Sequence, residues 1–153
     1  MLTITKEYSW AMAHMLAGHP GLCKNIHGHN YKMEVTVSRL NIEHEGFNDD
    51  ESSFKRTGMV IDFKDLKKIV NEGLVAKLDH AFMYNQFSTD DVELEVASLL
   101  ENHGKKVFKV NYRPTAENMA KHFFKFLNAR MPIGINVTRV KLYETDTSYA
   151  IYE

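Results

Sequence analysis

The chain has 153 residues, 44% of them hydrophobic and 25% charged, with a formal net charge of −1. Matched acidic and basic residues leave no positive surface for nucleic acid, and no apolar run reaches the roughly 20 residues that cross a membrane. The single cysteine excludes an internal disulfide framework. We therefore expect one domain spanning residues 1–153, working in the cytoplasm without a nucleic-acid or membrane partner.

The first predicted element is a strand from Leu2 to His14. Its large apolar residues, among them Tyr8, Trp10 and Met12, share one parity, and alternate residues of a strand face the same side. His14 has this parity too. It is therefore expected to face inward at the far end of the strand.

The next predicted strand begins with two histidines one residue apart. Apolar and polar residues alternate over 31–38, and His27 and His29 continue the apolar parity, so both imidazoles point to one side. A His-x-His pair alone is explained equally well by two strand-end histidines. His14, at the end of the neighbouring strand, favours a metal site over this interpretation, because three imidazoles suit Zn²⁺ and leave its fourth position open. We therefore predict a catalytic metal site.

Cys23 stands four residues before this pair, in a loop that contains glycine and proline. A lone cysteine is usually an inert buried thiol, but a loop position argues against a core residue. A nearby Zn²⁺ would favour the thiolate and make it a usable base, and direct ligation of the metal fits the spacing as well. The residues alone leave these roles open.

The middle of the chain is predicted to hold a connection and a helix. The polar, acidic stretch 41–58 is expected to join two strands, the second of them short and spanning 59–61. Asp62 has the position of an N-cap for a helix that runs to Leu78, with apolar residues at helical spacing and Gly73 weakening its middle.

The later elements are predicted from the same signals. We expect a short helix, a short strand, a second long helix that starts after an N-cap, and two final strands. They span, in order, 92–100, 107–110, Thr115 to Leu127, 135–144 and 148–152. This order predicts an α+β fold, with a mostly antiparallel four-stranded sheet that carries two main helices on one face. Other subunits would cover the other face.

Five further residues have both a structural and a functional interpretation. Asp79 and His80 are either a charged pair at a helix end or a carboxylate that orients an imidazole as a proton carrier. Glu144 shares parity with the apolar residues before it, so it should face the buried side and need a partner, either a basic side chain or the N–H groups of a ligand. Thr115 and Glu117 are adequately explained as helix-start residues.

Taken together, these motifs resemble the 6-pyruvoyltetrahydropterin synthase family, including its 6-carboxy-5,6,7,8-tetrahydropterin synthase branch. The matching segments cover nearly the whole chain, and their order is more specific than any one of them. They are Ala13-His14, Cys23-x-x-x-His27-Gly28-His29-Asn30-Tyr31, Gly58 to Phe63, Leu78-Asp79-His80, Pro114 to Asn118 and Glu144-Thr145.

The resemblance implies a tunnelling fold, whose subunits join into a barrel-like oligomer, commonly a hexamer. It also implies 7,8-dihydroneopterin triphosphate as the small-molecule substrate, with Asp79 and His80 offered from a neighbouring subunit. The implied roles are Zn²⁺ ligands for His14, His27 and His29, catalytic thiolate for Cys23, proton transfer for Asp79 and His80, pterin anchor for Glu144, and positions near the pterin for Thr115 and Glu117.

Three residues separate Cys23 from His27, which resembles the branch that forms 6-carboxytetrahydropterin and acetaldehyde on the way to queuosine. One alternative is a 6-pyruvoyltetrahydropterin synthase, which eliminates triphosphate from the same substrate. Another is a non-catalytic, zinc-containing oligomer that binds a pterin or purine. The chain departs from compact members of the family in its 41–58 connection and in a segment inserted over 86–113.

Overall fold

The computed structural model describes residues 1–39 and 57–153. Nearly all of the connection predicted over 41–58 therefore lies outside the described residues. None of the helices in the described part of the chain is long and apolar enough to cross a membrane. The described elements are, in order, β1 (Thr3–His14), η1 (Leu22–Lys24), β2 (His27–Arg39), α2 (Phe63–Val70), η2 (Asn71–Val75), α3 (Ala76–Leu78), β3 (Phe82–Asn85), α4 (Asp91–Asn102), β4 (Val107–Val110), α5 (Ala116–Asn128), β5 (Ile135–Tyr143) and β6 (Tyr149–Tyr152).

The strands form one mixed sheet of six, in the order β4-β3-β1-β2-β5-β6. Strands β1, β2, β5 and β6 are antiparallel neighbours, as predicted, whereas β3 and β4 extend the sheet beyond β1 in parallel. The prediction of a four-stranded antiparallel sheet is therefore wrong in strand number and partly in direction. Phe82, Met83 and Tyr84 are all buried, so β3 lacks the alternation that identifies a half-exposed strand.

The short strand predicted at 59–61 is also wrong, because these residues join no strand. The carbonyl of Val60 accepts a hydrogen bond from Arg39 Nε at 3.1 Å, in place of a neighbouring strand. Asp62, which follows directly, is the predicted N-cap: its carboxylate accepts from the backbone N–H of Lys64 at 2.7 Å. The helix signal at Asp62 ends the apolar run before a strand can form.

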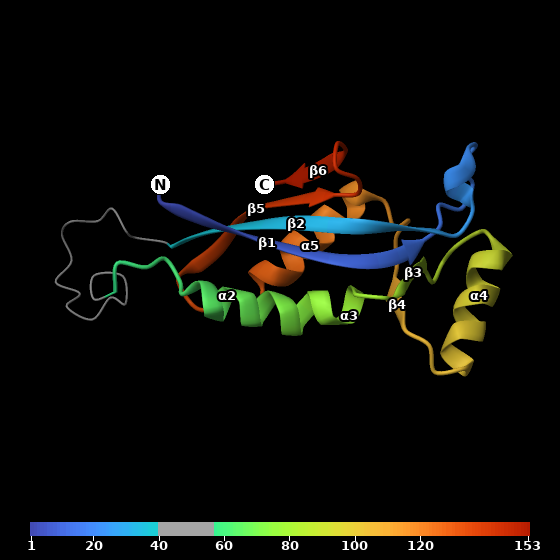
Figure 1. Cartoon of the computed structure of the whole chain (residues 1–153), viewed down its shortest axis with the longest axis horizontal. Coiled ribbons are helices and arrows are strands. Elements are labelled where there is room, and N and C mark those ends of the chain that lie inside the picture. The colour runs from blue at the N-terminus through green and yellow to red at the C-terminus, as the bar shows by residue number, and fades with distance from the viewer. Residues whose placement is uncertain (40–56) are drawn as a thin grey trace.

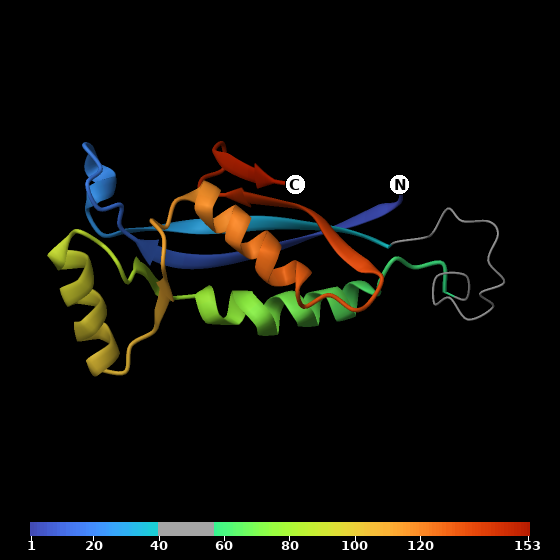
Figure 2. The ribbon, with the colours of Figure 1, turned by 180° about the vertical axis from the view of Figure 1, so that it is seen from behind.

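Two helices cover one face of the sheet, as predicted (Figures 1 and 2). Elements α2, η2 and α3 follow one another without a break, with the wider π turn of η2 spanning Gly73, and α5 lies beside them. Their buried residues, including Leu66 and Phe123, pack with Trp10, Tyr31 and Met33 of β1 and β2 in one core. The shorter α4 lies at the end of the sheet that carries β3 and β4.

The face of the sheet away from this core is polar. Across β2 and β5, Lys32 pairs with Tyr143, and Glu34 pairs with Lys141. The Tyr143 hydroxyl donates to Glu34 at 3.0 Å, and the Lys32 ammonium lies 4.2 Å from the Tyr143 ring centroid. Because these polar side chains contact one another, this part of the face does not require the apolar cover that a hydrophobic face would need.

Gly28 allows β1 and β2 to approach each other between the two histidines of β2. A Cβ at this position would lie 3.2 Å from the backbone oxygen of Met12, whereas a Cβ at Gly73 would meet only side-chain atoms at 3.7 Å. We expect Gly28→Ala to lower the free energy of unfolding by about 1 kcal/mol. The matched change Gly73→Ala, inside a helix, should raise it by about 0.5–1 kcal/mol. Urea unfolding of both variants measures the two signs, and a stabilising Gly28→Ala would contradict this packing.

Candidate metal centre

The antiparallel pairing of β1 and β2 brings three histidines to one end of the sheet. His14, the last residue of β1, is paired with His27, the first residue of β2, and Met12 is paired with His29. Their ring centroids are 4.6 Å (His14 to His27), 5.3 Å (His14 to His29) and 4.9 Å (His27 to His29) apart. One ligand nitrogen from each ring lies within 4.8 Å of the others. The described residues therefore contain a group that can hold a metal ion.

Backbone carbonyls fix the tautomers of two of these rings. His14 Nδ1 lies 2.8 Å from the Pro114 carbonyl, and His27 Nδ1 lies 2.8 Å from the Asn25 carbonyl. A carbonyl only accepts hydrogen bonds, so both Nδ1 atoms carry the proton and both Nε2 atoms present a lone pair. Metal-binding histidines are commonly oriented by such a hydrogen bond.

The two Nε2 atoms of His14 and His27 lie 3.1 Å apart. Two lone pairs facing each other at this distance repel unless a cation lies between them. Zinc–nitrogen bonds of about 2.0–2.1 Å at a tetrahedral angle place two ligand nitrogens about 3.3 Å apart. The geometry and the donor set therefore fit a zinc ion.

Burial keeps the central ligand neutral. His14 is completely buried, and desolvation lowers its pKa from 6.5 to about 4, with His27 and His29 adding to the effect and the Pro114 hydrogen bond opposing it. Burial also lowers the pKa of His29, against the raising influence of Glu144. A neutral imidazole is the form that binds a metal.

This burial predicts how stability depends on pH in the metal-free protein. Between pH 6.5 and 4, His14 takes up a proton in the unfolded chain and not in the folded one, so the free energy of unfolding falls as the pH falls. The expected loss from this group is about 2 kcal/mol at pH 5. Urea unfolding at pH 7 and pH 5 should show the full loss in wild type and in His103→Gln, at an exposed histidine, and a loss smaller by about 2 kcal/mol in His14→Gln, where the lowered pKa values of His29 and His122 still contribute. The same pH dependence in all three proteins would contradict this assignment.

Glu144 and Tyr31 border the three histidines. Glu144 directly follows β5, and its Oε1 lies 3.5 Å from His14 Nε2 and 3.7 Å from His29 Nε2. The Tyr31 hydroxyl lies 3.4 Å from His14 Nδ1. No pattern of residues singles out Tyr31 as a site residue, although it continues the parity of His27 and His29. The Glu144 carboxylate is 28% exposed, so a ligand at the metal can reach it.

Cys23 lies in the single turn η1, close in sequence to the histidines but outside the ligand group. It is partly buried, and its carbonyl accepts from the Leu16 N–H at 2.9 Å, which holds the turn against the chain that leaves β1. This placement argues against Cys23 as a fourth metal ligand.

Asp79 and His80 form a pair beyond the other edge of β1. Asp79 Oδ1 lies 2.9 Å from His80 Nδ1 and also accepts from the Ala11 N–H at 3.2 Å. Burial raises the pKa of Asp79, but the hydrogen bonds from Ala11 and His80 outweigh it and lower that pKa below its ordinary value. Lys106, which the sequence did not single out, donates to the backbone carbonyls of Ala76 and Asp79.

His80 has an unusual backbone conformation. Its φ is 62°, and its N–H donates to the Ala11 carbonyl at 2.7 Å. Non-glycine residues rarely adopt this conformation, which often marks a functional site and also occurs at helix ends. The side chain is 81% exposed. His80 is therefore anchored through its backbone while its ring stays accessible.

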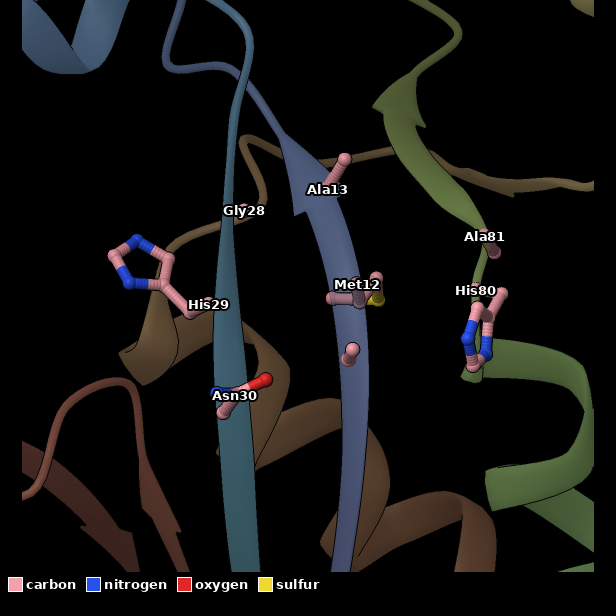
Figure 3. Close-up of a pocket in the computed structure, with 8 residues that line it drawn as sticks. Met12, Ala13, Gly28, His29, Asn30, His80 and Ala81 are labelled. Atoms are coloured by element: carbon pink, nitrogen blue, oxygen red, sulfur yellow. The ribbon is translucent and has the colours of Figure 1, made fainter.

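The structure does not bring His80 to the metal centre of the same chain. Both His29 and His80 line a cavity of about 350 Å³ over the end of β1 and β2. In Figure 3 the His29 ring points away from β1, and the His80 ring lies on the opposite side of the strand pair. Neighbouring strands are about 4.8 Å apart, so the backbones of these two residues, with β1 between them, are separated by about 10 Å.

Thr115 and Glu117 are placed as helix-start residues. The Thr115 hydroxyl caps α5 by accepting from the Asn118 N–H at 3.4 Å, and Glu117 is exposed in the first turn. The residue of this motif that reaches the metal centre is Pro114, through its carbonyl. Side-chain patterns cannot reveal such a backbone contact.

Comparisons with known proteins agree with one another. The family model described as 6-pyruvoyl tetrahydropterin synthase matches residues 3–153. A 6-carboxy-5,6,7,8-tetrahydropterin synthase from Haemophilus influenzae is 39% identical over 153 residues, which cover 100% of this chain and 99% of that protein. A 6-pyruvoyl tetrahydrobiopterin synthase from Pongo abelii is 31% identical over 87% of this chain and 71% of its own length. The solved structure of the Plasmodium falciparum 6-pyruvoyl tetrahydropterin synthase has the same fold, with a TM-score of 0.67 and 20% identity over 99% of this chain and 96% of that one.

Proposed function

The chain belongs to the 6-pyruvoyl tetrahydropterin synthase family, and we propose that it is a zinc-dependent lyase acting on 7,8-dihydroneopterin triphosphate. The proposed products, formed with the uptake of one water molecule, are 6-carboxy-5,6,7,8-tetrahydropterin, acetaldehyde and triphosphate, and the proposed pathway is queuosine biosynthesis. The observation that carries this proposal is the histidine group, in which the Nε2 atoms of His14 and His27 face one point and His29 completes the set.

In this proposal His14, His27 and His29 hold the metal. A bound Zn²⁺ would polarise the hydroxyl groups of the substrate side chain and so stabilise negative charge on them. Glu144, whose carboxylate lies within 3.7 Å of His29 Nε2, would accept hydrogen bonds from the amino-pyrimidinone edge of the pterin. The substrate would then extend from Glu144 across the open side of the metal centre.

Cys23 is proposed as the base that removes a carbon-bound proton. It lies in η1, between β1 and β2 in the sequence, and does not belong to the ligand group. His80, oriented by Asp79, would move protons on the other side of the substrate. A general base must lie within about 3 Å of its proton, so a His80 whose backbone lies about 10 Å from that of His29 in its own chain would act at the centre of a neighbouring subunit.

The choice between the two products rests on two observations. The carboxytetrahydropterin synthase from Haemophilus influenzae is more similar, at 39% identity, than the pyruvoyl enzyme from Pongo abelii, at 31%. The three residues between Cys23 and His27 also resemble the carboxy branch. The length of this segment decides where the thiol lies relative to the substrate side chain.

The test is to incubate zinc-loaded protein with 7,8-dihydroneopterin triphosphate and to identify the products by mass. We expect 6-carboxytetrahydropterin together with acetaldehyde, and loss of both after chelation. Formation of 6-pyruvoyltetrahydropterin without acetaldehyde would replace the proposal with the other branch. If metal-loaded protein forms neither tetrahydropterin, the assignment is wrong.

A further inference from the structure

A second cavity, of about 570 Å³, lies between α5 and the chain that joins β4 to it. Its lining includes Asn111 and Tyr112 from the connection and Lys121, His122 and Lys125 from α5. None of the three histidines of the metal centre lines it. The wall that faces α5 belongs to the 86–113 segment, which has no role in the proposed reaction.

One face of α5 supplies two of the three lysines that line this cavity, and Lys109 of β4 is the third. Asn118, Lys121, His122 and Lys125 follow one another at spacings of three, one and three residues, which places all of them on the same side of a helix. Among residues 1–39 and 57–153, neither lysine ammonium has a carboxylate within ion-pair distance. No acidic residue lines the cavity. Lys109, Lys121 and Lys125 therefore bring three positive charges to the cavity, and none of the three has a carboxylate counterion in the described part of the chain.

His122 adds a neutral donor beside these charges. Its Nδ1 lies 2.6 Å from the Tyr112 hydroxyl. Burial lowers the pKa of His122 and raises that of Tyr112, so both groups are neutral. In the tautomer whose Nδ1 accepts from the Tyr112 hydroxyl, the other ring nitrogen, Nε2, carries the proton and can donate to a ligand.

From this arrangement we infer that the cavity binds a phosphate group, either free or carried by a small organic molecule. Lys121 and Lys125 match the charge of about −1.5 to −2 that a phosphate monoester carries near pH 7. The imidazole N–H of His122 supplies a further hydrogen bond to its oxygens. The cavity volume lies within the range of small-molecule sites, so it has room for more than the phosphate itself.

Calorimetric titration of the full chain with inorganic phosphate and with ribose 5-phosphate tests this inference. The double variant Lys121→Gln/Lys125→Gln should weaken binding by about tenfold or more, because both charge-assisted contacts are lost. Lys64→Gln/Lys68→Gln removes an exposed lysine pair of the same spacing on α2, and it should bind as wild type does. Tyr112→Phe keeps both lysines but leaves His122 Nδ1 without its donor, and should weaken binding by about threefold.

If the two double lysine variants lose the same affinity for phosphate, the binding is general charge attraction and the inference is wrong. The inference is also wrong if wild type binds no phosphate. It is wrong as well if the only defect of Lys121→Gln/Lys125→Gln is a higher KM for the pterin substrate, because the cavity would then belong to that substrate. Tighter binding of ribose 5-phosphate would identify an organic ester, and equal binding would identify free phosphate. Binding is read without turnover, so the result does not depend on the proposed reaction.

Discussion

Cys23→Ala is expected to lower kcat with 7,8-dihydroneopterin triphosphate by about 10²–10⁴-fold, the usual contribution of a general base, while the zinc content of the protein stays unchanged. The reason is positional. The three ligand nitrogens gather without the sulfur of Cys23, so removal of the thiol leaves the metal-binding group complete. Activity and metal content, measured on the same preparation, separate a base from a ligand.

Leu22→Ala is the matched control for this change. Leu22 is the neighbouring residue of η1 and is 84% exposed, so its truncation tests disturbance of the turn without loss of the thiol. It should retain near wild-type activity. If Cys23→Ala loses zinc, Cys23 is a ligand; if it keeps full activity, the metal centre works without this thiol. Either result would remove Cys23 from the proposed role.

The histidine group could be predicted because it depends on local rules. A strand places alternate residues on one side, and β1 and β2 are consecutive antiparallel neighbours, so parity alone relates His14 to His27 and His29. The helix starts at Asp62 and Thr115 were predictable for a similar reason, since a cap depends on side chains two or three residues away.

The parts that could not be predicted depend on contacts between distant segments. Strand β3 pairs with β1 in parallel and is buried on both faces, so its sequence carries no alternation. The carbonyls of Pro114 and Asn25 orient His14 and His27, but a backbone atom leaves no trace in the pattern of side chains. The left-handed conformation of His80 follows from its docking on Ala11, which lies far away in the sequence.

A second large effect, the recovery of activity, is expected when two inactive variants are mixed. His80→Asn should lower kcat by about 10²–10⁴-fold on its own, and asparagine is chosen because it tolerates the left-handed backbone at this position. Cys23→Ala is inactive for a different reason. When the two chains assemble together in equal amounts, some neighbouring subunits place an intact Cys23 and an intact His80 at the same metal centre.

The recovered activity follows from counting subunits. If each site takes Cys23 from one chain and His80 from another, random assembly gives about a quarter of the sites both intact residues. If each site lies within a single chain, no site recovers. A mixture of wild type with the double variant Cys23→Ala/His80→Asn provides the control: about half of the wild-type activity is expected for sites within one chain and about a quarter for shared sites.

The structure favours the shared site, because the His29 and His80 rings lie on opposite sides of the β1–β2 pair, too far apart for direct proton transfer to one substrate atom. The backbone of Ala11 holds the Asp79–His80 pair through two hydrogen bonds, because its N–H donates to the Asp79 carboxylate and its carbonyl accepts from the His80 N–H. A local rearrangement of this segment would have to break both bonds. No recovery in the mixed assembly, together with half activity in the control, would therefore place His80 at the metal centre of its own chain and require that rearrangement.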